Sequence, residues 1–137
     1  MKKHILSIYL SLFAPIFLSA QSDYKVVFDL TSNDTMNHKA VIRWTNEIIK
    51  ASKDAQVEVV FYGNSLDMVQ KDKSIVADDV TKLSANKNVS FKVCSVAMKA
   101  HNVDKSQLIP GVETVPDGIY EIVTKQRDGW AYIKGIR

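Results

Sequence analysis

Cysteine is almost absent from this sequence of 137 residues, because Cys94 is its only one. A single cysteine excludes an internal disulfide framework and a metal cage built from several cysteines of one chain. Proline and glycine are also scarce, with three and five residues, which excludes a collagen-like chain. Any thiol chemistry of this chain must therefore use one sulfur atom.

A strong excess of charge of one sign is also missing. Lys and Arg total 18 and Asp and Glu total 15, and the excess falls to one if Lys2 and Lys3 are removed with an export signal. Such a balance gives no general attraction to nucleic acid or to anionic lipid. With 46% hydrophobic and 24% charged residues, the composition is typical of one ordinary globular domain.

Residues 1–20 are predicted to be an export signal. Two lysines and a histidine precede an apolar run at residues 5–18, and small residues at 19–20 suit signal peptidase, so we expect cleavage before Gln21. The run is shorter than the roughly 20 residues that span a bilayer as a helix, and no cysteine follows it to accept a lipid. An uncleaved membrane anchor is the alternative.

The mature chain, residues 21–137, is accordingly expected to be periplasmic or secreted, without stable membrane insertion after processing. Free thiols are often oxidised outside the cytoplasm. The expected location therefore makes Cys94 more interesting than a lone cytosolic cysteine would be.

From Tyr24 onward, short β-rich runs alternate with helical patterns. This alternation predicts an α/β fold, a three-layer α/β/α sandwich with a mainly parallel five-stranded sheet and helices on both faces. The predicted strands are residues 24–30, 56–62, 89–93, 112–115 and 130–134. The predicted helices are residues 36–53, 74–84, 95–102 and a last one from Pro116 and Asp117 to Gly129.

Cys94 lies where the third predicted strand ends and a helix begins. In open α/β sheets the carboxyl ends of the strands gather ligands, and the unpaired N–H groups at helix starts favour an anion such as a thiolate. Along residues 89–93 the apolar side chains alternate with Ser90 and Lys92, and Cys94 continues this polar side. The alternative is an inert, buried cysteine that packs as a small hydrophobic residue.

Six further residues are pocket candidates at this sheet edge, and no metal or cofactor is expected. Cys94 and His101 are seven residues apart, or about 10.5 Å along a helix, too far to hold one ion together. His38 is predicted to be a solvated helix residue, and no nucleotide-binding fingerprint is present. The pocket candidates are Asn33, Tyr62, Gly63, Asn64, Ser95 and Met98.

Three stretches, residues 93–103, 108–119 and 126–134, carry a family resemblance, and weaker similarity reaches back to Tyr24. They resemble the DsrE/DsrF-like family of sulfur-relay proteins in its small single-domain branch. The resemblance makes residues 21–137 one such domain with a three-layer α/β/α fold. It also implies that the chain assembles into oligomers and that Cys94 carries sulfur as a persulfide.

Two positions depart from the pattern that many relatives of this branch share. Val96 stands where they have asparagine, and Tyr62 stands where they have histidine. Each change removes a polar group that could hydrogen-bond a sulfur anion or pocket water. Sulfur-relay proteins are also usually cytoplasmic, whereas this chain carries an expected export signal.

Two functions of different classes follow. The first is a sulfur carrier that exchanges sulfur with a donor or acceptor protein, a small thiol or polysulfide. The second is a non-catalytic oligomeric binding module of the same fold. A thiol-disulfide oxidoreductase is a weaker candidate, because no second cysteine can resolve a mixed disulfide. Apolar surface from Trp44, Phe91 and Trp130 adds to the expectation of a homo-oligomer.

Overall fold

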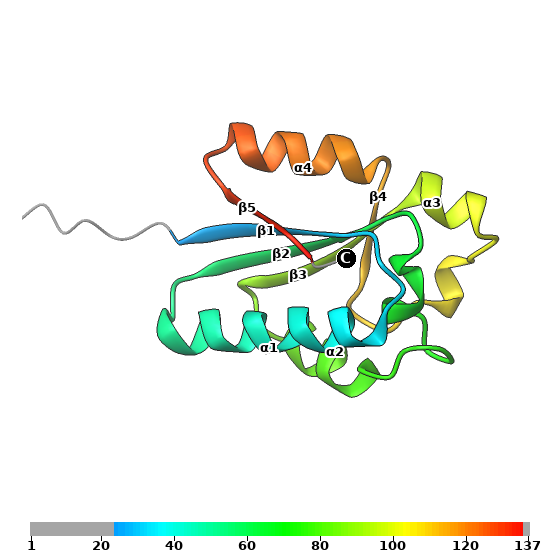
Figure 1. Ribbon diagram of the computed structural model, residues 1–137, viewed down its shortest axis with the longest axis horizontal. Coiled ribbons are helices and arrows are strands. Elements are labelled where there is room, and N and C mark those ends of the chain that lie inside the picture. Colours follow the sequence, from blue (N-terminus) through cyan, green and yellow to red (C-terminus); the bar gives the residue numbers. More distant parts are fainter. Residues whose placement is uncertain (1–23, 136–137) are drawn as a thin grey trace, which may run out of the picture.

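A parallel β-sheet forms the centre of the computed structural model, which describes residues 24–135 (Figure 1). Its strands are β1 (Lys25–Leu30), β2 (Gln56–Phe61), β3 (Val89–Cys94), β4 (Glu113–Val115) and β5 (Ala131–Lys134). Their order across the sheet is β4-β3-β2-β1-β5, and every neighbouring pair is parallel. The predicted α/β fold with a five-stranded sheet is therefore confirmed, and the sheet is parallel throughout these residues.

Helices cover both faces of the sheet. They are α1 (Thr35–Ala51), α2 (Ala77–Ser84), α3 (Ser95–Ala100) and α4 (Gly118–Arg127), with short 3₁₀ helices η1 (Ser65–Val69) and η2 (Lys105–Gln107). In Figure 1, α1 and α2 lie below the sheet and α4 lies above it, while α3 extends beyond the ends of the strands. Since α3 begins directly after β3, it stands at the carboxyl edge of the sheet.

The core is divided unequally between the two faces because side chains alternate along each strand. The larger part includes Phe28, Phe61 and Phe91, all completely buried, and the rings of Phe61 and Phe91 stack at 6.1 Å. On the other face, Val27 and Val60 form a smaller apolar cluster with Ile122 of α4. That face keeps room for polar side chains between the sheet and α4.

Several predicted boundaries were wrong by a few residues. Helix α1 ends at Ala51 because Ser52 is extended, and α3 ends at Ala100 because the chain turns and Asn102 has a φ of 52°. Helix α2 begins at Ala77 rather than at residue 74, where the chain forms a turn bonded back to Gln70. The helix η1 was not predicted at all.

Two predictions about single side chains were also wrong. His38 is only 2% exposed, not solvated, because the loop before α1 covers it and its Nε2 lies 3.0 Å from the carbonyl oxygen of Ser32. Phe91 is completely buried and offers no surface to a partner, whereas Trp44 and Trp130 are half-buried. The expectation that Phe91 adds apolar surface for a homo-oligomer is therefore wrong.

Within residues 24–135, no helix is both long and apolar enough to cross a membrane. The predicted export signal, residues 1–20, and its cleavage site before Gln21 lie outside the described residues.

Candidate functional site

Cys94 ends β3 and is the N-cap residue of α3. Its backbone is still extended, with φ −67° and ψ 118°, so the side chain leaves the strand just before the first helical turn. Among the residues that the structure describes, no side-chain hydrogen bond caps the start of this six-residue helix. The first N–H groups of α3 are therefore left without a side-chain acceptor next to the sulfur.

The start of α4 packs directly against Cys94. Gly118 is the first residue of α4, and a Cβ atom there would lie 3.1 Å from Cβ of Cys94 and 3.2 Å from Cγ1 of Val60. The absence of a side chain at Gly118 therefore permits this close approach. Two helix starts, those of α3 and α4, meet at the one cysteine.

Asp117 caps α4 at this meeting point. Its Oδ1 accepts hydrogen bonds from the backbone N–H groups of Ile119, at 2.8 Å, and Tyr120, at 3.1 Å. These two amides are consequently satisfied by a carboxylate of the chain itself. Asp117 also places a negative charge in the wall of the site.

A cavity of about 250 Å³ opens above the sulfur. Cys94 itself is only 5% exposed, whereas Val96 and Ile119 at the mouth are each 60% exposed. The residues that line the cavity are Tyr62, Gly63, Cys94, Val96, Ala97, Ala100, His101, Asp117 and Ile119. The sulfur is thus recessed behind mostly apolar walls.

Three of the seven predicted site residues, Cys94, Tyr62 and Gly63, line this cavity together. Met98 does not line it, because its side chain packs into the main core and is buried. The remaining candidates are also outside the lining: Asn33 in the exposed loop before α1, Asn64 at the start of η1, and Ser95 as the first residue of α3.

Asp117 and Ile119 were not among the predicted site residues. Both belong to the segment that follows β4, and β4 is the neighbour of β3, with Cys94 paired to Val115. The sequence signal for both residues is the predicted helix start at Pro116-Asp117, but the sequence alone does not place this start beside the thiol.

A row of polar side chains continues from the cavity across the α4 face of the sheet. Asp29 of β1 is only 4% exposed, and its Oδ2 accepts a hydrogen bond from the Tyr132 hydroxyl at 2.5 Å. The same oxygen lies 2.9 Å from Nζ of Lys134, which is 5.9 Å from the centroid of the Tyr62 ring. Tyr62 therefore connects this cluster with the wall of the cavity.

Both phenols of the row remain protonated at neutral pH. Burial raises the pKa of Tyr62 above its ordinary value, and the nearby Asp29 carboxylate adds to the shift. For Tyr132, the hydrogen bond to Asp29 and then burial raise the pKa to about 12. Each phenol is thus a stable hydrogen-bond donor at the edge of the site.

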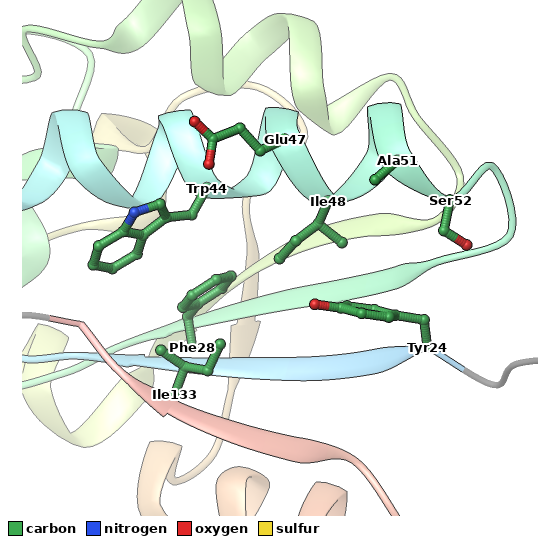
Figure 2. A pocket seen from close by; sticks show the side chains of 8 residues that line it. All are labelled: Tyr24, Phe28, Trp44, Glu47, Ile48, Ala51, Ser52 and Ile133. Atoms are coloured by element: carbon green, nitrogen blue, oxygen red, sulfur yellow. The ribbon is translucent and has the colours of Figure 1, made fainter.

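Other hollows in the described part of the chain contain no thiol. A polar one of about 380 Å³ lies at the opposite end of β2 and β3 and includes the buried Glu58, whose Oε2 pairs with Lys125 at 2.9 Å. A larger groove of about 570 Å³ lies between α1 and the strands β1 and β5. Figure 2 shows its walls: Tyr24, Phe28, Trp44, Glu47, Ile48, Ala51, Ser52 and Ile133.

In the described part of the chain, no group of three or more His, Cys, Asp or Glu side chains is arranged to hold a metal ion. His38 is occupied by its backbone partner, and His101 stands in the cavity wall without a second basic ligand beside it.

The sequence profile of the DsrE/DsrF-like family matches residues 25–134. This range covers most of the chain and every strand and helix described above. The protein therefore belongs to the DsrE/DsrF-like family. No curated protein matches its sequence significantly.

Solved structures share this fold. A protein of unknown function, MTH1491 from Methanobacterium thermoautotrophicum, is 31% identical with a TM-score of 0.77, over 82% of this chain and 99% of its own. The ychN protein from E. coli is 12% identical with a TM-score of 0.69, over 82% and 98%. BT1422 from Bacteroides thetaiotaomicron, a conserved protein of unknown function, is 13% identical with a TM-score of 0.65, over 81% and 94%.

Proposed function

We propose that this protein is an exported sulfur carrier that holds sulfur on Cys94 as a persulfide. The observation that carries the proposal is the position of the thiol, recessed in a cavity at the meeting point of two helix starts in a DsrE/DsrF-like domain. Ligands of open α/β sheets bind at this carboxyl edge. The thiol is the one nucleophile of the cavity with sulfur chemistry.

The proposed reaction is a transfer between two thiols. After the Cys94 thiol has lost its proton to solvent, the thiolate attacks the outer sulfur of a persulfide donor, R–S–SH. The new S–S bond forms as the old one breaks, so that Cys94–S–SH is produced and the donor leaves as the thiolate R–S⁻. An acceptor thiolate later removes the outer sulfur by the same step.

The surrounding residues have separate tasks in this proposal. The uncapped amides at the start of α3 stabilise negative charge on the sulfur atoms. The Tyr62 ring, held beside the Asp29 cluster, forms a fixed wall of the cavity, and Gly118 allows the start of α4 to pack against Cys94. His101 is the one basic side chain of the wall.

Export, assembly and partners are further parts of the proposal. We expect the purified native protein to begin at or near Gln21 and to be periplasmic or secreted, and N-terminal mass analysis measures this. A chain that starts at Met1 and fractionates with membranes would contradict it. We also expect a homo-oligomer and a donor or acceptor that is a protein, a small thiol or polysulfide.

The burial of Cys94 supports a second candidate, a non-catalytic binding module of the same fold. The thiol is 5% exposed and is part of the larger core cluster, as an inert cysteine would be. The Asp117 carboxylate in the same cavity also disfavours an additional anion.

Sulfur loading separates the two functions. Incubation of the folded protein with polysulfide should add the mass of one sulfur atom to the intact chain, and a reductant should remove it. The Cys94→Ser variant should take up none, and its nearly isosteric hydroxyl should preserve the circular dichroism spectrum and the oligomeric state. A thiol that alkylates only after unfolding and takes up no sulfur when folded would leave the binding module instead.

A further inference from the structure

A buried carboxylate lies between β2 and α4. Glu58 is only 1% exposed and stands beside Val27 of β1 and Ser90 of β3 in the sheet. Its Oε2 accepts a hydrogen bond from the Ser90 hydroxyl at 3.0 Å and pairs with Nζ of Lys125 at 2.9 Å. Its Oε1 is also buried and has no hydrogen-bond partner among the described residues. One oxygen of an ionised carboxylate is therefore removed from water without compensation, which is unfavourable.

A second carboxylate shares the same lysine. Nζ of Lys125 lies 3.8 Å from Oε1 of Glu121, which stands one turn earlier on α4. We call Glu58, Glu121 and Lys125 the Glu58 cluster. Its two carboxylates and one ammonium leave one net negative charge, and neither carboxylate can donate a hydrogen bond while both are ionised. One proton on Glu58 would remove that charge and make the buried carboxyl group a donor.

The surroundings of Glu58 favour its protonated form. Burial raises the pKa of Glu58 above its ordinary value of 4.5, the Lys125 ammonium opposes this rise, and Glu121 adds to it. The polar hollow of about 380 Å³, which Glu58 and Lys125 both line, opens beside the cluster. The other charged side chains around Glu58 are Lys25 and Asp29 on the same face of β1 and Lys87 and Lys92 in the wall of the hollow. Glu58 can therefore exchange a proton with solvent at a pH above 4.5.

A small apolar cluster attaches α4 to the sheet. Ile122 packs against Val27 and Val60, in a cluster much smaller than the core on the opposite face. Glu121 precedes Ile122 directly, and Lys125 follows it within one turn. The charged groups and the apolar contact thus occupy the same part of the helix. The charge state of the buried carboxylate therefore contributes to the attachment of α4.

We propose that the Glu58 cluster is a pH-sensitive switch that holds α4 firmly on the sheet while Glu58 is protonated and loosens it when Glu58 ionises. Protonation removes the buried charge and gives the unpaired oxygen a hydrogen to donate, and Lys125 keeps its pair with Glu121. The switch extends to the cavity, because Gly118 at the start of the same helix packs against Cys94. Loosening of α4 therefore exposes the thiol more often.

Hydrogen exchange of the α4 backbone amides tests the switch. Because the folded state binds the Glu58 proton more tightly than the unfolded state does, the contribution to stability is complete below about pH 4.5 and is lost as the pH rises through the raised folded pKa. Protection factors of α4, which correct for the intrinsic pH dependence of exchange, should therefore fall severalfold between pH 4.5 and pH 8. The amide of Glu58→Gln supplies a donor and an acceptor at every pH. Its protection factors should change much less and should exceed those of the parent at pH 8.

A matched control and a second reporter accompany this comparison. Glu47→Gln makes the same chemical change at a side chain of α1 that is 66% exposed, and it should follow the parent. The same pH dependence in the parent and in Glu58→Gln would overturn the inference. The alkylation rate of Cys94 tests the link to the cavity. The ratio of the parent rate to the Glu58→Gln rate, in which ionisation of the thiol cancels, should rise severalfold from pH 5 to pH 8, and a constant ratio would overturn that link.

A direct titration of the parent decides the question even if Glu58→Gln fails to fold. The side-chain carboxyl carbon of Glu58 can be followed by NMR, and its titration midpoint should lie above 4.5. The midpoint should move to lower pH in Glu121→Gln, where the second carboxylate is absent. A midpoint at or below 4.5 in the parent would contradict the switch. Neither result depends on sulfur loading, so the carrier function is tested separately.

Discussion

Two mostly apolar hollows in the described part of the chain, the groove beside α1 and the cavity at the start of α3, differ in size and in the reactivity of their walls. The groove beside α1 has about 570 Å³ and is lined by aromatic and aliphatic side chains, as Figure 2 shows, with Glu47 as its one charged residue. The cavity at the start of α3 has about 250 Å³ and contains the thiol, a histidine and a carboxylate. The larger hollow has space without a reactive group.

The position of each hollow in the sheet explains this contrast. The groove exists because α1 packs over β1 and β2, while no helix within residues 24–135 covers the edge strand β5 on the side of the groove. The cavity lies at the carboxyl ends of β2, β3 and β4, where backbone amides at helix starts are available to a ligand. Volume alone would have selected the groove and not the cavity that contains the thiol.

Truncation of a side chain in the wall of the groove tests the structural role of the groove, and it has the largest expected effect on stability. Trp44 stacks on Phe28 at 6.0 Å between ring centroids, so Trp44→Ala should lower the free energy of unfolding by about 3 kcal/mol. Urea unfolding measures this loss. The rate of Cys94 alkylation in the folded variant should stay unchanged, because no lining residue of the cavity is altered. A loss of thiol reactivity in a variant that keeps its fold would contradict the prediction that the groove and the cavity are independent.

Overpacking the contact between α4 and Cys94 should have the reverse pattern, with a smaller loss of stability and a large loss of thiol reactivity. In Gly118→Ala the new Cβ would lie 3.1 Å from Cβ of Cys94, which is tighter than ordinary contact. We expect a loss of about 1–2 kcal/mol from this overpacking, together with slower alkylation and slower sulfur loading of Cys94. Val123→Ala, on the exposed part of α4, is the control and should alter neither rate. Unchanged reactivity in Gly118→Ala would show that the packing of α4 against Cys94 does not control the reactivity of the thiol.

The sequence could predict the fold because its signals are local. Alternation along Val89, Phe91 and Val93 marks a strand with one deeply buried face, and the helical patterns between strands require parallel pairing through crossovers. The helix η1 was missed because its buried apolar residues follow neither the period of a strand nor that of an α-helix. Its place depends on packing against the rest of the chain.

The site could be predicted only in part, for a related reason. Cys94 and the end of β2 are found by locating the carboxyl ends of strands, a local inference. Asp117 reaches the cavity because β4 is placed beside β3, an order that the sequence leaves open. His38 was misjudged because its partner is a backbone oxygen in a preceding loop, which no periodicity indicates.

The polar row beside the cavity gives the last and smallest effect, on stability at alkaline pH. Tyr132 has a folded pKa of about 12, above its ordinary value of 10.0, because its hydroxyl donates to Asp29. Because the pKa is raised, the folded state keeps the phenol proton up to a higher pH than the unfolded state does. This contribution is complete below about pH 10 and is lost as the pH rises from 10 toward 12. Burial raises the pKa of Tyr62 in the same direction, which adds to the loss.

Tyr132→Phe should therefore lower the free energy of unfolding at pH 8 by about 1 kcal/mol and make its decline between pH 10 and pH 12 shallower. Urea unfolding at several pH values measures both effects. Tyr120→Phe, on the exposed surface of α4, is the matched control and should reproduce the parent profile. If Tyr132→Phe also slows alkylation of Cys94 while the fold is retained, the Asp29 cluster contributes to the cavity through Tyr62, and the boundary of the site extends across the sheet to β5. If alkylation is unchanged, the cluster stabilises the α4 face alone, and the contrast between the two hollows depends only on the residues that line each of them.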